Sequence, residues 1–284
     1  MASLTATHMQ RVFTSRHIKF IVGNKGTCYT ISEAALDRIC PDGSFAYYLD
    51  FHKRHRGHHT GMPQIESPKL SDTVTWDVVD EDVFVRLMEY AYRGDYSVPA
   101  LQKLDDKASL NHEMHCLDSR LAIRGDQCPN IASFFFELGK QFQEEAMKPF
   151  SHPNQSASVA FIDDIKQTDR VGHNEVFLCH IKLYQLAEDF RIRSLENLCE
   201  ERLMKSLLFF PHHEVAIDDL FKVVAFVREQ NMEHIRGILL DFFVIEFPNL
   251  RTYPEFSELI MGDARFGLEF IERLPGGLHS QWQA

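Results

Sequence analysis

The chain has 284 residues, of which 44% are hydrophobic and 25% are charged, as in an ordinary globular protein with a substantial core. Its formal net charge of −11 argues against general nucleic-acid binding, which requires a basic surface. No apolar run reaches the roughly 18 residues of a membrane-spanning helix, and the first residues lack the apolar core of a secretory signal, so we expect no membrane or secretory role.

The six cysteines form no Cys-x-x-Cys pair, so we expect free thiols in a reducing compartment, the cytoplasm or the nucleus.

The N-terminal part predicts a small sheet with helices. Residues 1–16 are expected to be disordered. Residues 17–23 alternate polar and apolar side chains, and residues 27–31 form a second β-prone run after a turn signal, so the two predict a β-hairpin. Ser32 is the expected N-cap of the helix that follows.

A strand over residues 73–79 is expected to place Val74, Trp76 and Val78 on one face. The next helix begins at Asp80 or Asp82 and has a helical apolar stripe. That stripe consists of Phe84, Leu87, Met88 and Ala91.

Gly94 comes just after this stripe, within the tripeptide Arg93-Gly94-Asp95. Such a tripeptide can be a cell-adhesion signal, and a second copy stands at Arg124-Gly125-Asp126. A glycine at this position also suits a left-handed helix C-cap, and we favour that role because no secretory signal is present.

Residues 97–172 have no long periodic run and are interpreted as a partly disordered insertion. Within it, Asn130–Phe150 predicts an amphipathic helix, because Phe134, Leu138 and Phe142 recur every four residues. This helix could bind in a partner's groove or cover the protein's own core, and we favour the core.

Residues 173–209 and 210–284 predict successive helices that pack through apolar stripes. The stripes comprise Leu183, Leu186, Ala187 and Phe190; Leu195, Leu198, Cys199 and Leu203; Ile217, Leu220, Phe221 and Val224; and Ile235, Ile238, Leu239 and Phe242. Pro248 and Pro254 are expected to punctuate the chain before a last helix pair over residues 254–260 and 264–274.

Four blocks, in this order, resemble a BTB/POZ domain. They are FIVGNKGTCYTISEAAL, VTWDVVDEDVFVRLMEYAYRGDY, KLYQLAEDFRIRSLENLCEERL and YPEFSELIMGDARFGLEFIERL, of which the last is similar to the C-terminal helices of filamentous-fungal BTB proteins. The resemblance implies an α+β fold: residues 17–96 form the core of a small sheet with clustered helices, residues 173–209 close it, and residues 210–284 are an all-helical extension. It also implies a non-enzymatic protein–protein interaction module.

The resemblance further implies two protein-binding surfaces. One allows self-association as a homodimer, although the short stretch before Ile18 leads us to expect that the swapped strand and helix of many BTB dimers are absent. The other engages a cullin scaffold in some relatives, which then act as substrate adaptors for ubiquitin ligation. On this chain it would comprise the partner-binding residues Tyr48, Phe51, His52, Tyr92 and Tyr96.

The chain departs from the family pattern in several places. Many BTB domains have His where this chain has Ser32, and Ser-Pro-x-Phe where it has Pro41-Asp42-Gly43-Ser44-Phe45. The insertion separates two of the blocks, and the hydrophobic-x-Glu element that helps cullin docking is not evident after Phe51.

Two histidine-bearing segments leave a metalloprotein or an unrecognised enzyme as the alternative class. In the first, His52, His55, His58 and His59 alternate with Lys and Arg, which repel a cation and favour a solvated basic loop over a metal site or a pH-sensitive docking loop. In the second, His112, His115, Cys116 and Cys128 could hold zinc, but their spacing matches no standard finger, so we favour unliganded side chains.

No nucleophile motif, phosphate-binding glycine loop or dinucleotide fingerprint is present, so we expect neither catalysis nor a cofactor. The charged run CEERLMK is interpreted as a solvated helix face.

Overall fold

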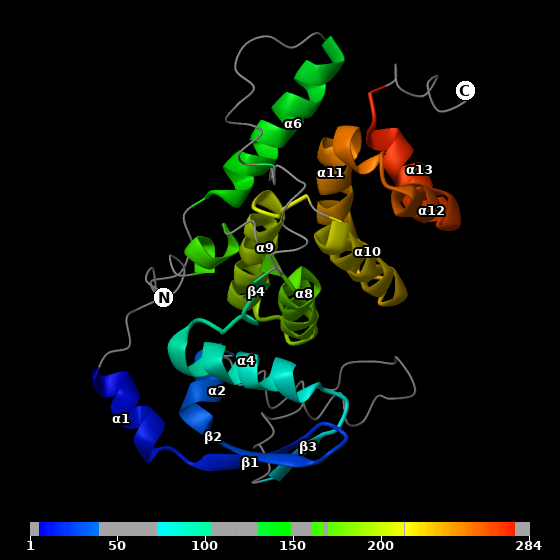
Figure 1. Ribbon diagram of the computed structural model, residues 1–284. Coiled ribbons are helices and arrows are strands. Elements are labelled where there is room, and N and C mark those ends of the chain that lie inside the picture. The colour runs from blue at the N-terminus through cyan, green and yellow to red at the C-terminus, as the bar shows by residue number, and fades with distance from the viewer. Residues whose placement is uncertain are drawn as a thin grey trace, which may run out of the picture. The chain divides into compact units, whose positions relative to one another are not determined.

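The computed structural model describes residues 6–39, 73–103, 117, 130–148, 161–166, 170–212 and 214–275. It is a mixed α+β structure with a small three-stranded sheet and a helical C-terminal region (Figure 1). The chain divides into two compact units. The first contains residues 1–97, 151–157 and 182–198, and the second contains residues 98–150, 158–181 and 199–284.

The sheet of the first unit has the order β2-β1-β3. Strand β1 (His17–Val22) pairs antiparallel with β2 (Thr27–Ser32), which confirms the predicted hairpin, and parallel with β3 (Thr73–Trp76). The β1 pattern places Ile18, Phe20 and Val22 in the core, each with no exposed surface.

Strand β3 is shorter than the sequence predicted. It ends at Trp76, and the side chain of Val78 is 67% exposed, so Val78 does not share the buried face of Val74 and Trp76. The chain turns after Trp76 to enter helix α4, so the alternation of a strand no longer applies at Val78.

Helix α4 (Glu81–Arg93) packs on one face of this sheet (Figure 1). The predicted stripe is confirmed, because Phe84, Leu87, Met88 and Ala91 are all buried. The ring of Phe84 lies 5.3 Å from that of Phe20 and 5.9 Å from that of Trp76, so the helix is fixed on the sheet by aromatic contacts.

Helix α1 (Ala6–Thr14) precedes the sheet, and its Val12 is buried. The expectation of disorder over residues 1–16 is therefore wrong for these nine residues, and a helix stands before β1 where we expected none. A helix of this length has little stability on its own, but its amphipathic spacing allows an apolar face to pack on α2 (Glu33–Ile39). This packing stabilises the helix.

Ser15 supplies the hydroxyl that we expected from Ser32 at the start of α2. The amide of Ala34 donates to Ser15 Oγ over 3.3 Å, and the hydroxyls of Ser15 and Ser32 lie 2.7 Å apart. Ser32 itself is the last residue of β2, so the helix is capped from a distant part of the chain.

In the second unit, the two short strands β4 (Gln102–Lys103) and β5 (Arg170–Val171) pair antiparallel and bring the ends of the insertion together. The insertion contributes helix α6 (Asn130–Ala146), as predicted. Phe142 is buried as predicted, but in the first half of the helix the buried positions lie one residue later than the predicted Phe134 and Leu138. Its buried residues include Phe135, Gly139, Phe142 and Ala146, while Phe134 and Leu138 are only half-buried.

Helix α6 packs on α11 (Glu233–Leu250) through the ring pairs Phe135–Phe247 and Phe142–Phe242. The interpretation that α6 covers the protein's own core is therefore confirmed. Pro248 lies inside α11 and does not end it. A proline this close to the last turn removes a single backbone hydrogen bond, and the helix continues to Leu250.

The other predicted helices are α8 (His173–Asp189), α9 (Arg193–Leu208), α10 (Glu214–Glu229), α12 (Pro254–Gly262) and α13 (Ala264–Arg273). Their predicted apolar stripes are buried, except that Phe221 is half-buried.

An aromatic cluster anchors the last helix pair. Phe243 of α11 stacks on Phe256 of α12, and Phe266 and Phe270 of α13 complete the cluster.

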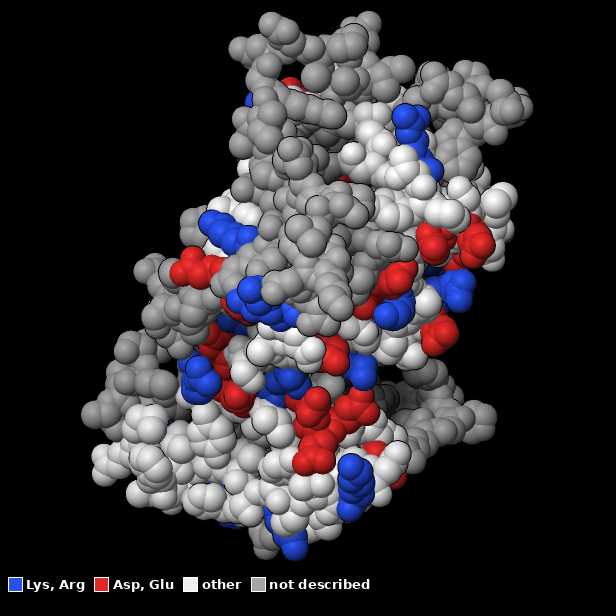
Figure 2. All heavy atoms as spheres, in the orientation of Figure 1, with Lys and Arg blue, Asp and Glu red and all other residues white. Residues whose placement is uncertain are grey.

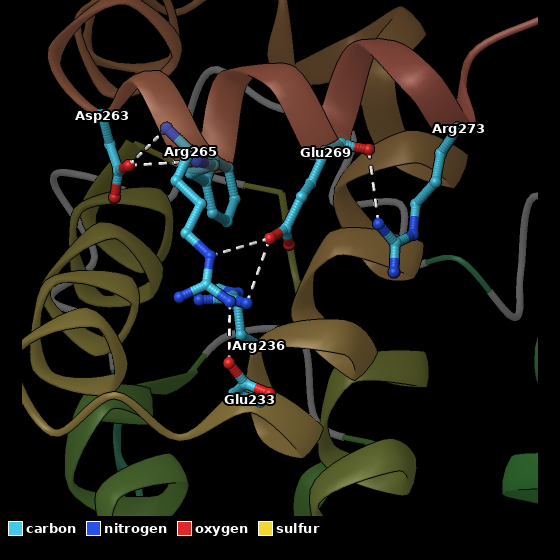
Figure 3. A network of polar contacts seen from close by, with 7 residues as sticks. Glu233, Arg236, Asp263, Arg265, Glu269 and Arg273 are labelled. Carbon is cyan, nitrogen blue, oxygen red and sulfur yellow. Dashed lines mark hydrogen bonds and ion pairs between the residues drawn. The ribbon is translucent and has the colours of Figure 1, made fainter.

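A polar network between α13 and α11 orients α13 (Figure 3). Asp263 is the N-cap, since its carboxylate accepts from the amides of Arg265 and Phe266. Arg265 pairs with Glu233 of α11 over 2.7 Å and with Glu269 over 3.1 Å. These hydrogen bonds raise the pKa of Arg265 and lower the pKa of Glu233. Because both side chains are exposed, we expect the network to orient α13 relative to α11 more than to stabilise the fold.

Candidate functional site

The corner at Gly94 is the first region that the sequence singled out. Gly94 has a φ of +73° and is the left-handed C-cap of α4, with its amide donating to the carbonyl of Tyr90 over 2.8 Å. Asp95 is only 3% exposed. The predicted capping role is confirmed, and a buried aspartate cannot be displayed as an adhesion signal; Arg124-Gly125-Asp126 lies outside the described residues.

The structure places two of the five predicted partner-binding residues on either side of this glycine. The hydroxyl of Tyr92 accepts a hydrogen bond from the amide of Ser32 over 2.9 Å and so joins α4 to the end of β2. Tyr96 is 3% exposed, so its side chain is not available to a partner at this surface, contrary to our prediction. Tyr48, Phe51 and His52 lie outside the described residues.

The surface that α4 does present consists of other residues. These residues share the side of the helix opposite its buried stripe and are spaced at i, i+3, i+4, i+7 and i+11. They are Asp82, Val85, Arg86, Glu89 and Arg93. We call them the α4 outer face. Their helical spacing is visible in the sequence.

The segment after Gly94 folds back against this outer face. Ser97 donates its amide to Glu89 over 2.6 Å and accepts a bond from Arg86 Nε over 3.1 Å. Acidic side chains gather near α4 in Figure 2. Around the start of this helix, Asp77, Asp80 and Asp82 are exposed. The helix therefore offers an ordered, charged surface with Val85 as an apolar centre, 37% exposed.

A second polar cluster lies on α9 in the second unit, and the sequence did not reveal it. Arg202, Lys205 and Ser206 occupy one helical face and are 2%, 2% and 3% exposed. We interpreted the run CEERLMK as a solvated face, which is wrong for Arg202 and Lys205. Together with Phe209, these residues form a buried stripe, here called the α9 basic stripe.

Groups distant in the sequence surround the basic stripe. The guanidinium of Arg202 lies 5.1 Å from the centroid of the Phe161 ring, and Lys205 Nζ donates to the carbonyl of Lys148 over 3.3 Å. The buried His180 lies within 3.4 Å of Ser206 Oγ. Phe161 and Lys148 both belong to the insertion, so a sequence window around α9 contains no sign of them.

Burial lowers the pKa of Lys205, because the ammonium loses hydration, and Arg202 nearby lowers it further against the opposing effect of Glu201. A buried lysine with a lowered pKa can mark a reactive site. Here its nitrogen already donates a hydrogen bond to the carbonyl of Lys148, just after α6, so the contact is a structural one.

Glu246 of α11 is another buried ionisable side chain in the second unit, and it has no exposed surface. Asn249 donates to its carboxylate over 3.0 Å, and His212 Nε2 lies 3.4 Å from the same oxygen. The imidazole of His212 also packs beside the rings of Phe210 and Phe242, so this is an internal polar contact of a helical core.

No group of three or more metal-ligating side chains occurs among the described residues. Both histidine-bearing segments that could bind a metal, including His112, His115, Cys116 and Cys128, lie outside them. In the part of the chain that the structure describes, no helix is both long and apolar enough to cross a membrane.

Comparisons with known proteins identify no relative. No protein-family model matches the chain, and no curated protein and no solved structure matches it either.

Proposed function

We propose that this chain is a non-enzymatic protein–protein interaction module of the BTB/POZ type, acting in the cytoplasm or the nucleus. The observation that carries the proposal is the topology of the first unit. A hairpin leads through α2 to a strand parallel to β1, and α4 then crosses the sheet and stops on a left-handed glycine. This is the order of elements that the sequence resemblance implies for such a domain.

The closing helices support the same proposal. Within the first unit, Phe190 packs its ring 5.1 Å from that of Trp76, and Tyr90 donates its hydroxyl to Ser194 over 2.8 Å. Residues 182–198 therefore complete the core of the sheet, as the resemblance implies for the block KLYQLAEDFRIRSLENLCEERL.

The narrower proposal is that the module is a substrate adaptor that engages a cullin scaffold. The α4 outer face is the surface we assign to it, with Val85 at the centre and Asp82, Arg86, Glu89 and Arg93 around it. An apolar centre with a charged rim is typical of a specific interface. Tyr48, Phe51 and His52 are proposed to extend it.

An affinity pull-down of the tagged chain from its native cells, followed by mass spectrometry, tests both levels of the proposal. The matched variants are Val85→Arg, on the α4 outer face, and Leu268→Arg, at an exposed position of α13. We expect a stoichiometric cullin and its RING partner with the wild type and with Leu268→Arg, and their loss with Val85→Arg.

Other outcomes separate the alternatives. Another protein that is lost only with Val85→Arg would contradict the adaptor role and leave the interaction module standing. No reproducible partner, together with stoichiometric zinc retained after dialysis, would overturn the interaction module in favour of a metalloprotein built on the histidine-bearing segments.

A further inference from the structure

The last helix pair carries an apolar surface that no described part of the chain covers. Met261 of α12 and Leu268 of α13 are 76% and 59% exposed, and they are the two most exposed large apolar side chains among the described residues of the second unit. Their neighbours Ile260 and Gly267 lie against each other, because a Cβ built on Gly267 would be 2.4 Å from the carbonyl oxygen of Ile260. Met261 and Leu268 therefore project from adjacent points of the contact between the two helices.

Two further side chains extend this surface along α13. Ala264, Leu268 and Ile271 follow the spacing i, i+4 and i+7, which places them on one face of the helix. Ala264 is exposed and Ile271 is half-buried. We call Met261, Ala264, Leu268 and Ile271 the α12–α13 patch. An apolar stripe with this spacing is the pattern by which one helix packs on another.

The cations of the last helix pair are engaged on the other flank of α13. Arg265 pairs with Glu233 of α11 over 2.7 Å and with Glu269 over 3.1 Å (Figure 3). Arg273 pairs with Asp241 of α11 over 3.1 Å. Helices α12 and α13 contain no other Lys, Arg or His. Each cation of this helix pair is therefore neutralised on the side of α13 that faces α11.

The carboxylates beside the patch have no such compensation. Glu258 stands three residues before Met261 on α12, and Glu272 stands four residues after Leu268 on α13, so each is a neighbour of a patch residue on the same helix face. Both carboxylates are exposed, and no ion pair joins either of them to a described residue. The patch therefore has an apolar centre and an acidic rim.

We propose that the α12–α13 patch binds an amphipathic helix of a partner protein, with lysine or arginine on both sides of its apolar stripe. The occupant is a helix because side chains at i and i+4 pack into the grooves of another helix, and the surface of a helix offers no backbone donors or acceptors to a strand. Its basic flanks are the charges that complement Glu258 and Glu272. The inference uses no residue of the α4 outer face and is independent of the proposed adaptor role.

The acidic rim also argues against the two occupants that this chain could supply itself. A second copy seated patch to patch would bring an identical rim against Glu258 and Glu272, and like charges opposed at an interface cost free energy. Residues 276–284 contain Leu278 and Trp282 at helical spacing, but their only basic side chain is His279. Neither occupant supplies cations on both sides of an apolar stripe.

Fluorescence anisotropy of a labelled synthetic helix tests the proposal on the full-length chain. The probe has about 14 residues, enough to form a helix on the protein, with leucine at helical spacing and lysine elsewhere. A second probe has glutamate in place of every lysine. The test variants are Leu268→Ser in the patch and Glu272→Gln in its rim. Their matched controls are Met147→Ser, at another exposed apolar position, and Glu137→Gln, at another exposed carboxylate.

We expect the lysine probe to bind the wild type and both controls equally, and the glutamate probe to bind none of them. Leu268→Ser should weaken binding of the lysine probe about ten-fold, because the central apolar contact is removed. Glu272→Gln should weaken it about three-fold and reduce its dependence on salt, because one charge pair at the rim is lost. The circular dichroism spectrum should be the same for all variants, since the substituted side chains are exposed.

Other results would overturn the proposal. If both probes bound alike, the rim charges would play no part. If Leu268→Ser bound the lysine probe as tightly as the wild type, the binding would be a general attraction to a chain of net charge −11. If sedimentation equilibrium showed a dimeric wild type and a monomeric Leu268→Ser, the patch would belong to a second copy. If Trp282→Ala strengthened binding of the lysine probe about ten-fold, the occupant would be the chain's own last residues.

Discussion

Replacement of Gly267 by alanine tests the packing of the last helix pair. Gly267 lies in the middle of α13, where it faces α12. A Cβ built on it would lie 2.4 Å from the carbonyl oxygen of Ile260 and 3.4 Å from its carbonyl carbon. The obstacle is backbone, so a side-chain rotation cannot relieve it and the two helices must separate.

Two opposing effects set the size of the change. Alanine is favoured over glycine inside a helix by about 1 kcal/mol. Overpacking a well-packed core costs about 1–3 kcal/mol. Because the contact is shorter than Cβ atoms tolerate, we expect the upper part of that range and a net loss of about 1–2 kcal/mol in the free energy of unfolding for Gly267→Ala.

Gly237 of α11 is the matched control, since a Cβ built there meets no atom within 4 Å. Gly237→Ala should therefore raise the free energy of unfolding by about 1 kcal/mol through helix propensity alone. Urea denaturation followed by circular dichroism measures both variants. If Gly267→Ala also raised the unfolding midpoint, the close approach of α12 and α13 would be refuted.

Three further predictions concern polar groups. Tyr92→Phe should destabilise the chain by about 1–3 kcal/mol in urea, because the buried amide of Ser32 loses its acceptor; an unchanged midpoint would contradict this. The hydrogen bond to Glu81 raises the pKa of Tyr29 to about 12, so Glu81→Gln should return it toward 10 in a phenolate absorbance titration with Tyr29→Phe as baseline. The pKa of Tyr29 is higher in the folded than in the unfolded chain, so the stability that this hydrogen bond contributes is present below pH 10 and is lost between pH 10 and about 12. If Glu81→Gln left the pKa of Tyr29 unchanged, the hydrogen bond to Glu81 would be excluded as the cause of the raised pKa. Lys205→Met should raise the free energy of unfolding at neutral pH by about 1 kcal/mol, because a buried ammonium is removed, whereas Lys222→Met at an exposed site should change it little. Since the pKa of Lys205 is lowered on folding, that gain should shrink as the pH rises toward 10.5, and a gain that grows instead would contradict the assignment.

Local patterns in the sequence were sufficient for the hairpin, for the start of β3 and for most helices. Alternation in residues 17–22 predicted which side of β1 is buried, and the i, i+3, i+4, i+7 spacing from Phe84 to Ala91 predicted the core face of α4. Gly94 was predictable because a left-handed C-cap requires little more than a glycine after the last apolar position. In each case the signal and its cause lie within a few residues of each other.

Predictions failed where two candidates had similar local patterns. Phe134, Phe135 and Phe136 are consecutive, so spacing alone could not tell which of them faces α11. Tyr92 and Tyr96 were both predicted as partner-binding residues because the family resemblance implies a binding surface near the Gly94 helix stop. In the structure, the hydroxyl of Tyr92 contacts β2 and the side chain of Tyr96 is buried. Neither the contact nor the burial can be inferred from the neighbouring residues in the sequence.

The α9 basic stripe and the β2 edge together show why charge in the sequence was a poor guide to binding surfaces. Arg202 and Lys205 looked solvated, yet Phe161 and the Lys148 carbonyl of the insertion cover them, so they are not available to an acidic partner. Strand β2 carries no charge, yet the backbone amides and carbonyls of Cys28 and Thr30 face away from β1. Hydrogen-bonding capacity on a sheet edge depends on register, and register is set by β1 and by Tyr92. A search for partner surfaces on this chain should therefore begin with its backbone edges, the α4 outer face and the α12–α13 patch.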